Sequence, residues 1–298
     1  MELNIEHATA DKLYMRIEKL LEWHRYDEAI KETEEWIRIN PGDPDGFAML
    51  AKIFLYKDDY PKALQLCQET FKMDPENVLA WNVKVGAYYS MQNWKLFSAA
   101  VEDALILFPF EDHYYFLRGN MFNKQGDFNK AKEDFERCLE VNPENALYLA
   151  NYSYTLAITD ELQRSKEIQQ KALEFEPDSS HVFLYLAWAA DHRRDYKEAI
   201  EFLKNAIRLD PEDTQIRQEY LSILQKQYLF YRVLLYPGML LGRLKPWQFW
   251  IIWPLTWIIF KKLVILFLII YFVSHWLTKL LVHIKVFGWK FSFKKARS

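Results

Sequence analysis

Residues 126–143 read GDFNKAKEDFERCLEVNP, a stretch that begins with a glycine-containing turn and ends on a proline. That proline is one of six that follow one another at intervals of 34 residues, namely Pro41, Pro75, Pro109, Pro143, Pro177 and Pro211. Proline lacks a backbone N–H and disfavours helix at the residue before it, so each one ends a helix and begins a new unit. A period of this length indicates a repeat architecture, and this decides the fold.

Three further positions keep the phase of the prolines. A large apolar or aromatic residue lies fifteen positions before each proline: Tyr26, Tyr60, Trp94, Phe128, Leu162 and Tyr196. Mostly small residues lie twelve positions before it: Ala29, Ala63, Phe97, Ala131, Ser165 and Ala199. Another mostly small set lies five positions before it: Trp36, Thr70, Ala104, Cys138, Ala172 and Ala206. Because small side chains let helices cross closely, each unit is predicted to be a pair of amphipathic helices.

This pattern resembles the tetratricopeptide repeat (TPR). The segments Tyr26-Asp27-Glu28-Ala29-Ile30, Gly126-Asp127-Phe128-Asn129-Lys130-Ala131 and Tyr196-Lys197-Glu198-Ala199-Ile200 are similar to the start of the second helix in that family. Gly119 and Trp81 fit positions in the first helix. The resemblance implies an all-α fold, a right-handed superhelical solenoid of helix-turn-helix repeats in which stacked neighbours share one core.

Four bulky residues depart from the family pattern. Phe97 and Trp36 stand where small residues are expected, and Ile17 and Val85 replace the usual Gly or Ala. We expect these side chains to push neighbouring helices apart around the first and third repeats.

Charge divides the chain into two parts. Before position 228 there are 27 basic and 41 acidic residues, a net charge of −14, whereas the rest has eleven basic residues and no acidic one. The acidic part favours basic partners, although most of its charges are expected on solvated faces. The N-terminus is acidic and has no apolar run, so it is not a secretory signal, and we expect the repeats to lie in the cytoplasm.

The C-terminal part is apolar and aromatic. Residues 246–260 and 263–277 are two uncharged runs of 15 residues, separated by Lys261-Lys262. Each run gives about 22 Å of helix, short of the ~30 Å hydrocarbon core, but flanking lysines can extend their reach. One span would leave the basic tail outside against the positive-inside rule, so a hydrophobic helical hairpin is favoured over a single span. Two buried soluble helices are the other alternative.

The sequence therefore predicts an integral membrane protein with interface anchors at Lys245, Trp247, Lys261, Lys262, Lys279 and Trp289. The predicted segments are a lead-in (1–9), a solenoid of six 34-residue repeats and a capping helix (10–227), a juxtamembrane interfacial segment (228–245), a membrane hairpin (246–282) and a basic, aromatic tail (283–298). The tail interleaves aromatic and basic residues, as single-stranded nucleic-acid binders do. Membrane lipids are the preferred partner, because the acidic solenoid would repel phosphate.

The resemblance implies that the first helices line a concave groove that binds a protein or peptide. Candidate groove residues are Asn82, Tyr89, Asn120, Asn123, Asn151, Tyr154, Tyr185 and Trp188. Asparagine can both donate to and accept from a peptide backbone, while Tyr and Trp add rigid contact area. Alternatively, several of these asparagines cap turns or face water.

Chaperone-binding members of the family grip a carboxylate with Lys, Asn and Arg side chains. The corresponding early positions here are Tyr14, Glu18 and Met49, with Lys52 as the one basic residue, so that clamp is predicted to be absent.

No motif points to catalysis: there is no glycine-rich phosphate loop, no His-Glu-x-x-His and no nucleophile elbow. Cys67 and Cys138 fall at helix-packing positions and are interpreted as reduced core thiols. We therefore expect no enzyme activity, no cofactor, no metal and no nucleic-acid ligand. The leading hypothesis is a membrane-anchored scaffold or assembly factor. The alternative is a non-catalytic accessory subunit of a membrane enzyme or transporter complex.

Overall fold

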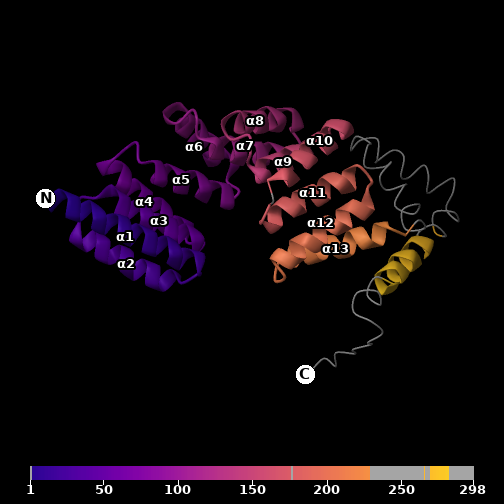
Figure 1. Ribbon diagram of the computed structural model, residues 1–298, viewed down its shortest axis with the longest axis horizontal. Coiled ribbons are helices and arrows are strands. Elements are labelled where there is room, and N and C mark those ends of the chain that lie inside the picture. The colour runs from indigo at the N-terminus through magenta and orange to yellow at the C-terminus, as the bar shows by residue number, and fades with distance from the viewer. Residues whose placement is uncertain (1, 176, 229–264, 266–268, 282–298) are drawn as a thin grey trace, which may run out of the picture. The chain divides into compact units, whose positions relative to one another are not determined.

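A computed structural model describes residues 2–175, 177–228, 265 and 269–281, and the regular secondary structure within these ranges is helical throughout (Figure 1). The chain divides into two compact units, residues 1–143 and residues 144–298. The all-α, TPR-like solenoid expected from the repeats is confirmed in its local architecture, in which a first helix, a tight turn and a second helix recur in order.

The first unit contains eight described helices: α1 (Glu2–Glu22), α2 (Tyr26–Ile39), α3 (Pro44–Tyr56), α4 (Tyr60–Met73), α5 (Val78–Ser90), α6 (Trp94–Leu107), α7 (Asp112–Gln125) and α8 (Phe128–Val141). Each helix packs against the next, and α3 also contacts α5, the first helix of the following repeat. The first helix begins at Glu2, so it takes in most of the expected lead-in.

The second unit begins with five helices: α9 (Ala146–Ile158), α10 (Leu162–Glu174), α11 (Ser180–His192), α12 (Tyr196–Leu209) and α13 (Thr214–Lys226). α9 packs against α10 and α11, α11 packs against α12, and α12 packs against α13 (Figure 1). α13 lies at the end of the predicted solenoid segment 10–227, where the capping helix is expected. Residues 269–281 form a further helix in this part of the chain.

The six phase-keeping aromatic or large apolar residues are the first residues of the second helices α2, α4, α6, α8, α10 and α12. Most of these helices are capped by the preceding side chain. Asp59, for example, accepts a hydrogen bond from the backbone N–H of Lys62, and Asp195 accepts one from that of Glu198. Such a cap satisfies an N–H that has no partner within its own helix. The local sequence therefore fixes where each second helix begins.

The turn between the two helices of every repeat contains one residue in the left-handed conformation. These residues also lie 34 apart: His24, Asp58, Gln92, Gly126, Asp160 and Arg194. Gly126, with φ of 79°, is the one glycine among them, and it adopts this conformation without steric cost.

The small-residue positions form the helix contacts, as predicted. Ala29, Ala63, Ala131 and Ala199 are fully buried, and so is the Cys138 thiol. Burial raises the pKa of both cysteine thiols, that of Cys67 to about 12, in keeping with reduced core thiols.

Gly119 shows why a side chain is excluded at one first-helix position. A Cβ atom at Gly119 would lie 3.0 Å from a ring carbon of the fully buried Phe135, so the two helices α7 and α8 approach closely there.

The bulky departures widen the repeats that contain them, as expected. The helix pairs α1–α2 and α5–α6 pack less closely than the corresponding pairs of the other repeats. Trp36 and Phe97 fill the additional space, and both are buried. The Trp36 indole N–H also donates to Asp43 over 3.0 Å.

The predicted membrane segments fall largely outside the described residues. The described residues do not include 229–245 of the juxtamembrane segment, most of the hairpin 246–282 or the tail 283–298. They also do not include the anchors Lys245, Trp247, Lys261, Lys262 and Trp289. Within the described ranges, no helix combines the length and the apolar character that a membrane crossing requires. The remaining anchor, Lys279, is exposed in helix 269–281.

Candidate peptide-binding surface

The repeat spacing places three of the candidate residues, together with Glu219, at two positions of the first helices. Tyr154 on α9 and Trp188 on α11 are 34 residues apart, and so are Tyr185 on α11 and Glu219 on α13. Equivalent positions on stacked first helices lie on the same face of a solenoid. Glu219 was not among the residues singled out from the sequence, although adding one repeat to Tyr185 leads to it.

We call Tyr154, Tyr185, Trp188 and Glu219 the aromatic–acidic patch. The ring centroid of Tyr154 lies 6.2 Å from that of Tyr185 and 5.6 Å from that of Trp188, and those two rings are 5.1 Å apart and perpendicular. These are the separations of mutually stabilising aromatic pairs. All four residues are half-buried, so their side chains are held in place and still reach the surface.

The Glu219 carboxylate is the acidic group of the patch. Burial raises the pKa of this carboxyl above its ordinary value, and the hydrogen bond from Trp188 opposes that rise. Burial also raises the pKa of the Tyr154 hydroxyl. A half-buried carboxylate near Trp188 and Tyr154 is incompletely solvated, and it gains from any donor or cation that approaches it.

Other charges surround the patch. Asp191 accepts a hydrogen bond from the Lys226 ammonium over 2.6 Å, so these two charges compensate each other. The His192 ring lies 5.6 Å from the Tyr154 ring, and burial lowers the pKa of this imidazole, which keeps it neutral at neutral pH.

In the first unit, Tyr89 packs with its ring edge-on to the rings of Trp94 and Phe97, at 5.7 and 5.5 Å. Burial raises the pKa of its hydroxyl to about 12. The Lys124 ammonium lies 5.0 Å from the Tyr89 ring centroid and 5.6 Å from that of Trp94, which is within range of a cation–π interaction.

The four candidate asparagines do not form one exposed ladder. Asn120 is 7 % exposed and Asn151 is fully buried, while Asn82 and Asn123 are half-buried. The Asn151 amide donates to the carbonyl of Leu147 over 2.9 Å, and its Oδ1 has no partner among the described residues. The Oδ1 of Asn82 is likewise buried without a described partner. Asn120 and Asn151 are therefore less accessible than the aromatic candidates, which are half-buried.

The early repeats do not present a free cation at the expected clamp position. The Lys52 ammonium is 2.6 Å from Glu18, and this ion pair occupies the one basic residue noted there. In the part of the chain that the structure describes, no three His, Cys, Asp or Glu side chains come close enough to hold a metal ion.

Comparison with known proteins supports the fold. Tetratricopeptide-repeat family profiles match residues 114–145 and 180–213. The solved APC/C hetero-tetramer Cut9–Hcn1 contains a similar fold, with a TM-score of 0.63 and 15 % identity over 72 % of this chain and 42 % of that one. A Pseudomonas aeruginosa pilF structure has a TM-score of 0.57 and 17 % identity, covering 73 % of this chain and 98 % of its own.

The curated relatives are longer proteins, and this chain matches only part of each. The DnaJ homolog subfamily C member 7 homolog of Schizosaccharomyces pombe is 22 % identical over 70 % of this chain and 40 % of its own. The human mitochondrial import receptor subunit TOM70 is 24 % identical over 61 % of this chain and 31 % of its own. The chain thus spans less than half the length of these relatives. It nevertheless carries tetratricopeptide repeats in an all-α solenoid, the architecture of protein-interaction scaffolds.

Proposed function

We propose that this protein is a membrane-attached interaction scaffold that holds an extended segment of a partner protein against the first-helix face of its repeats. The observation that carries this proposal is the aromatic–acidic patch, where three half-buried rings are positioned by the 34-residue register.

Tyrosine and tryptophan supply large, rigid contact areas, and they dominate the binding free energy of many protein interfaces. In the patch, each ring is fixed by the other two, so little side-chain freedom remains to be lost on binding. The same residues do not form the hydrophobic core of the unit, which is built from fully buried side chains such as Leu156, Leu186 and Leu203. A contact surface explains their partial exposure better than a packing role does.

Removing two of the rings tests the groove. We expect Tyr154→Ala combined with Trp188→Ala to weaken partner binding by about 30-fold or more, since interface hot spots contribute about 2 kcal/mol or more. The measurement is quantitative affinity capture of partners by the full chain in mild detergent, followed by mass spectrometry. Ile106→Ala is the matched control, because Ile106 is 79 % exposed and lies on α6, a second helix. Equal losses in the two variants would refute the proposed groove.

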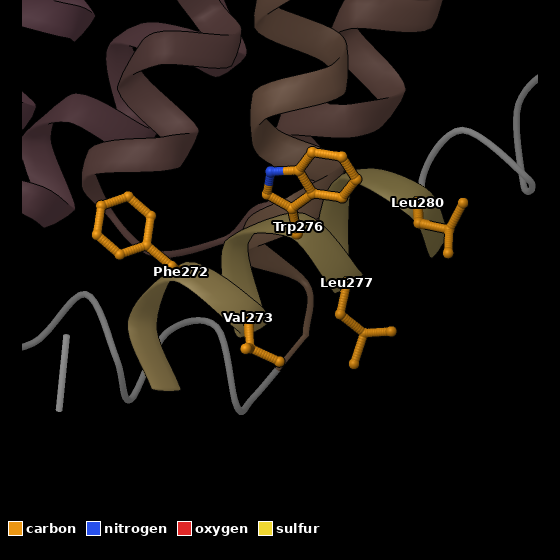
Figure 2. Close-up of a pocket in the computed structure, with 5 residues that line it drawn as sticks. All are labelled: Phe272, Val273, Trp276, Leu277 and Leu280. Carbon is orange, nitrogen blue, oxygen red and sulfur yellow. The ribbon is translucent and has the colours of Figure 1, made fainter. Parts of the chain in front are cut away.

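The membrane part of the proposal rests on helix 269–281. Most of its exposed side chains are large and apolar, Lys279 being charged. Five of the apolar residues follow one another along one face: Phe272, Val273, Trp276, Leu277 and Leu280 (Figure 2). Water-soluble helices place such residues inside and polar ones outside. An exposed apolar patch of this kind is typical of a surface that meets lipid or another protein.

The opposite face of this helix carries small hydroxyl residues. Ser274 and Thr278 are buried, and the Thr278 hydroxyl donates to the carbonyl of Ser274 over 2.6 Å. The Ser274 hydroxyl oxygen has no hydrogen-bond partner among the described residues. A helix that buries hydroxyls and exposes Trp276 has the polarity of a helix in lipid, where a threonine can bond to its own backbone as Thr278 does. Its 13 residues extend about 20 Å, so we propose that it supports attachment to the hydrocarbon layer.

Replacing Phe272, Trp276 and Leu280 by Gln is expected to reduce membrane association by about 100-fold or more. Each large apolar side chain that leaves water contributes about 1.5–3 kcal/mol, so three of them exceed that factor. Flotation of the purified full chain with phosphatidylcholine–phosphatidylserine vesicles measures the association. The control replaces Ile39, Ile106 and Phe110, three exposed apolar residues of the repeats, by Gln. Unchanged flotation of the first variant would exclude this face as a lipid contact.

A further inference from the structure

We infer that the aromatic–acidic patch is a subsite for the guanidinium group of an arginine in the bound segment. This inference rests on the proposed function, which supplies the peptide, and it adds the chemical class of side chain that the second unit recognises.

The charge balance of the patch leaves one carboxylate available. The Lys226 ammonium forms its ion pair with Asp191, and the effects of these two charges on the pKa of Glu219 oppose each other. The partner that Glu219 has is the neutral Trp188 indole N–H. A carboxylate has about four acceptor directions, so a single donor leaves room for a bidentate cation.

The aromatic rings favour the same ligand. Their faces carry negative electrostatic potential, and a cation within about 6 Å of a ring centroid is attracted to it. In the first unit, the chain supplies this cation itself, because Lys124 lies over Tyr89 and Trp94. Among the described residues, no Lys or Arg lies over the rings of Tyr154 or Trp188, so these two are open to a cation from a partner.

Arginine fits this combination better than lysine does. Its planar guanidinium can stack on a tyrosine or tryptophan ring while it donates two parallel hydrogen bonds to a carboxylate. The neighbouring His192 does not compete, because burial keeps its imidazole neutral at neutral pH. The acidic excess before position 228, 41 acidic against 27 basic residues, also attracts a basic segment over a longer range.

The test compares two blocked pentapeptides, Ala-Ala-Arg-Ala-Ala and its citrulline counterpart, which keeps the shape of arginine without its charge. Binding to the full chain in detergent micelles is followed by fluorine NMR after incorporation of 5-fluorotryptophan, with Trp188→Phe identifying the Trp188 signal. We expect the arginine peptide to shift this signal and to bind at least tenfold more tightly than the citrulline peptide.

Two variants isolate the carboxylate. Glu219→Gln keeps the size of the side chain and an acceptor for the Trp188 indole, and it is expected to abolish the tenfold preference. Glu201→Gln removes one negative charge from an exposed residue of α12 and is expected to retain the preference. Circular dichroism verifies that both variants keep the helical content of the wild-type chain.

Equal affinity for the two peptides, a Trp188 signal that does not move, or a preference that survives in Glu219→Gln would each overturn the arginine subsite. These results are distinct from failure of the proposed function, which is read from partner capture by the wild type and by the Tyr154→Ala/Trp188→Ala variant. Capture that depends on the rings but not on Glu219 would leave a scaffold whose patch recognises an uncharged side chain.

Discussion

Phe97→Ala is expected to lower the local free energy of unfolding of the third repeat by about 3–5 kcal/mol, the usual cost of removing a buried phenylalanine ring. The substitution would restore the small residue found at the same position in four other repeats, in which Ala29, Ala63, Ala131 and Ala199 occupy it. A rule based on repeat consensus would therefore expect a gain in stability. The structure predicts the opposite.

The reason is the spacing of the backbone. α5 and α6 stand further apart than the helices of the neighbouring repeats, and the fully buried Phe97 ring fills the interval. It packs edge-on against Tyr89 at 5.5 Å and against Trp94 at 6.2 Å. Alanine would leave a cavity, because these two large rings prevent the helices from closing to the distance seen in other repeats.

Amide hydrogen exchange of the full chain, read by mass spectrometry, measures this effect locally. A loss of about 3–5 kcal/mol corresponds to exchange that is faster by about two to three and a half orders of magnitude. The acceleration should appear in peptides from α5, α6 and α7, because each repeat depends on its nearest neighbours. Leu96→Ala is the matched control, since Leu96 precedes Phe97 on the same helix and is 43 % exposed. Slower exchange in Phe97→Ala would show that the helices do close.

The repeat register made the helix boundaries predictable. Each second helix begins at the aromatic or large apolar residue fifteen positions before a proline, because that residue follows a capping position. The same helix ends shortly before the proline, because proline cannot continue it. The conformation of the turns was less predictable from the sequence. Gly126 signals a left-handed residue, but Asp58, Gln92 and Arg194 adopt the same conformation without any glycine, and a turn residue of that kind carries no compositional mark.

The candidate surface was predictable only in part. Tyr154 and Trp188 occupy equivalent helix positions, which the period gives directly, and Tyr185 lies three residues before Trp188 on α11. Burial of Asn120 and Asn151 could not be predicted, since it depends on how tightly neighbouring side chains close around an amide. The pairing of Asp191 with Lys226 also escaped prediction, because it joins two helices through long side chains whose direction the sequence does not fix.

The buried ion pair between Arg118 on α7 and Asp134 on α8 could not be predicted from the sequence for the same reason. Breaking it is the second change that we expect to have a large effect on stability. The Arg118 Nη2 and Nε atoms donate to the two carboxylate oxygens of Asp134 over 2.7 and 2.9 Å. Asp134 is 5 % exposed and Arg118 is 25 % exposed. Burial raises the pKa of the Asp134 carboxyl above its ordinary value even beside the guanidinium. The carboxylate therefore depends on its partner more than the guanidinium does.

Arg118→Met is accordingly expected to cost about 3–5 kcal/mol at neutral pH, because it leaves a buried carboxylate without its compensating charge. Asp134→Leu should cost less, about 1–3 kcal/mol, since the partly exposed Arg118 can turn toward water. In Arg118→Met the folded-state pKa of Asp134 rises further above the unfolded value of about 3.9, so the folded state binds the proton more tightly. Its deficit should shrink as the pH is lowered from 7 toward 4.

The double variant Arg118→Met/Asp134→Leu separates charge compensation from packing. Replacing both partners removes two charges that were costly to desolvate and retains much of the volume, so its stability should lie within about 1 kcal/mol of the wild type. Hydrogen exchange in α7 and α8 across this double-mutant cycle measures the coupling between the two side chains. If the two single losses simply added in the double variant, the ion pair would not be the source of either loss. Suppose instead that the double variant loses less stability than the sum of the two single losses, and that the loss in Arg118→Met becomes smaller as the pH falls. The uncompensated Asp134 carboxylate would then be the main cause of the loss.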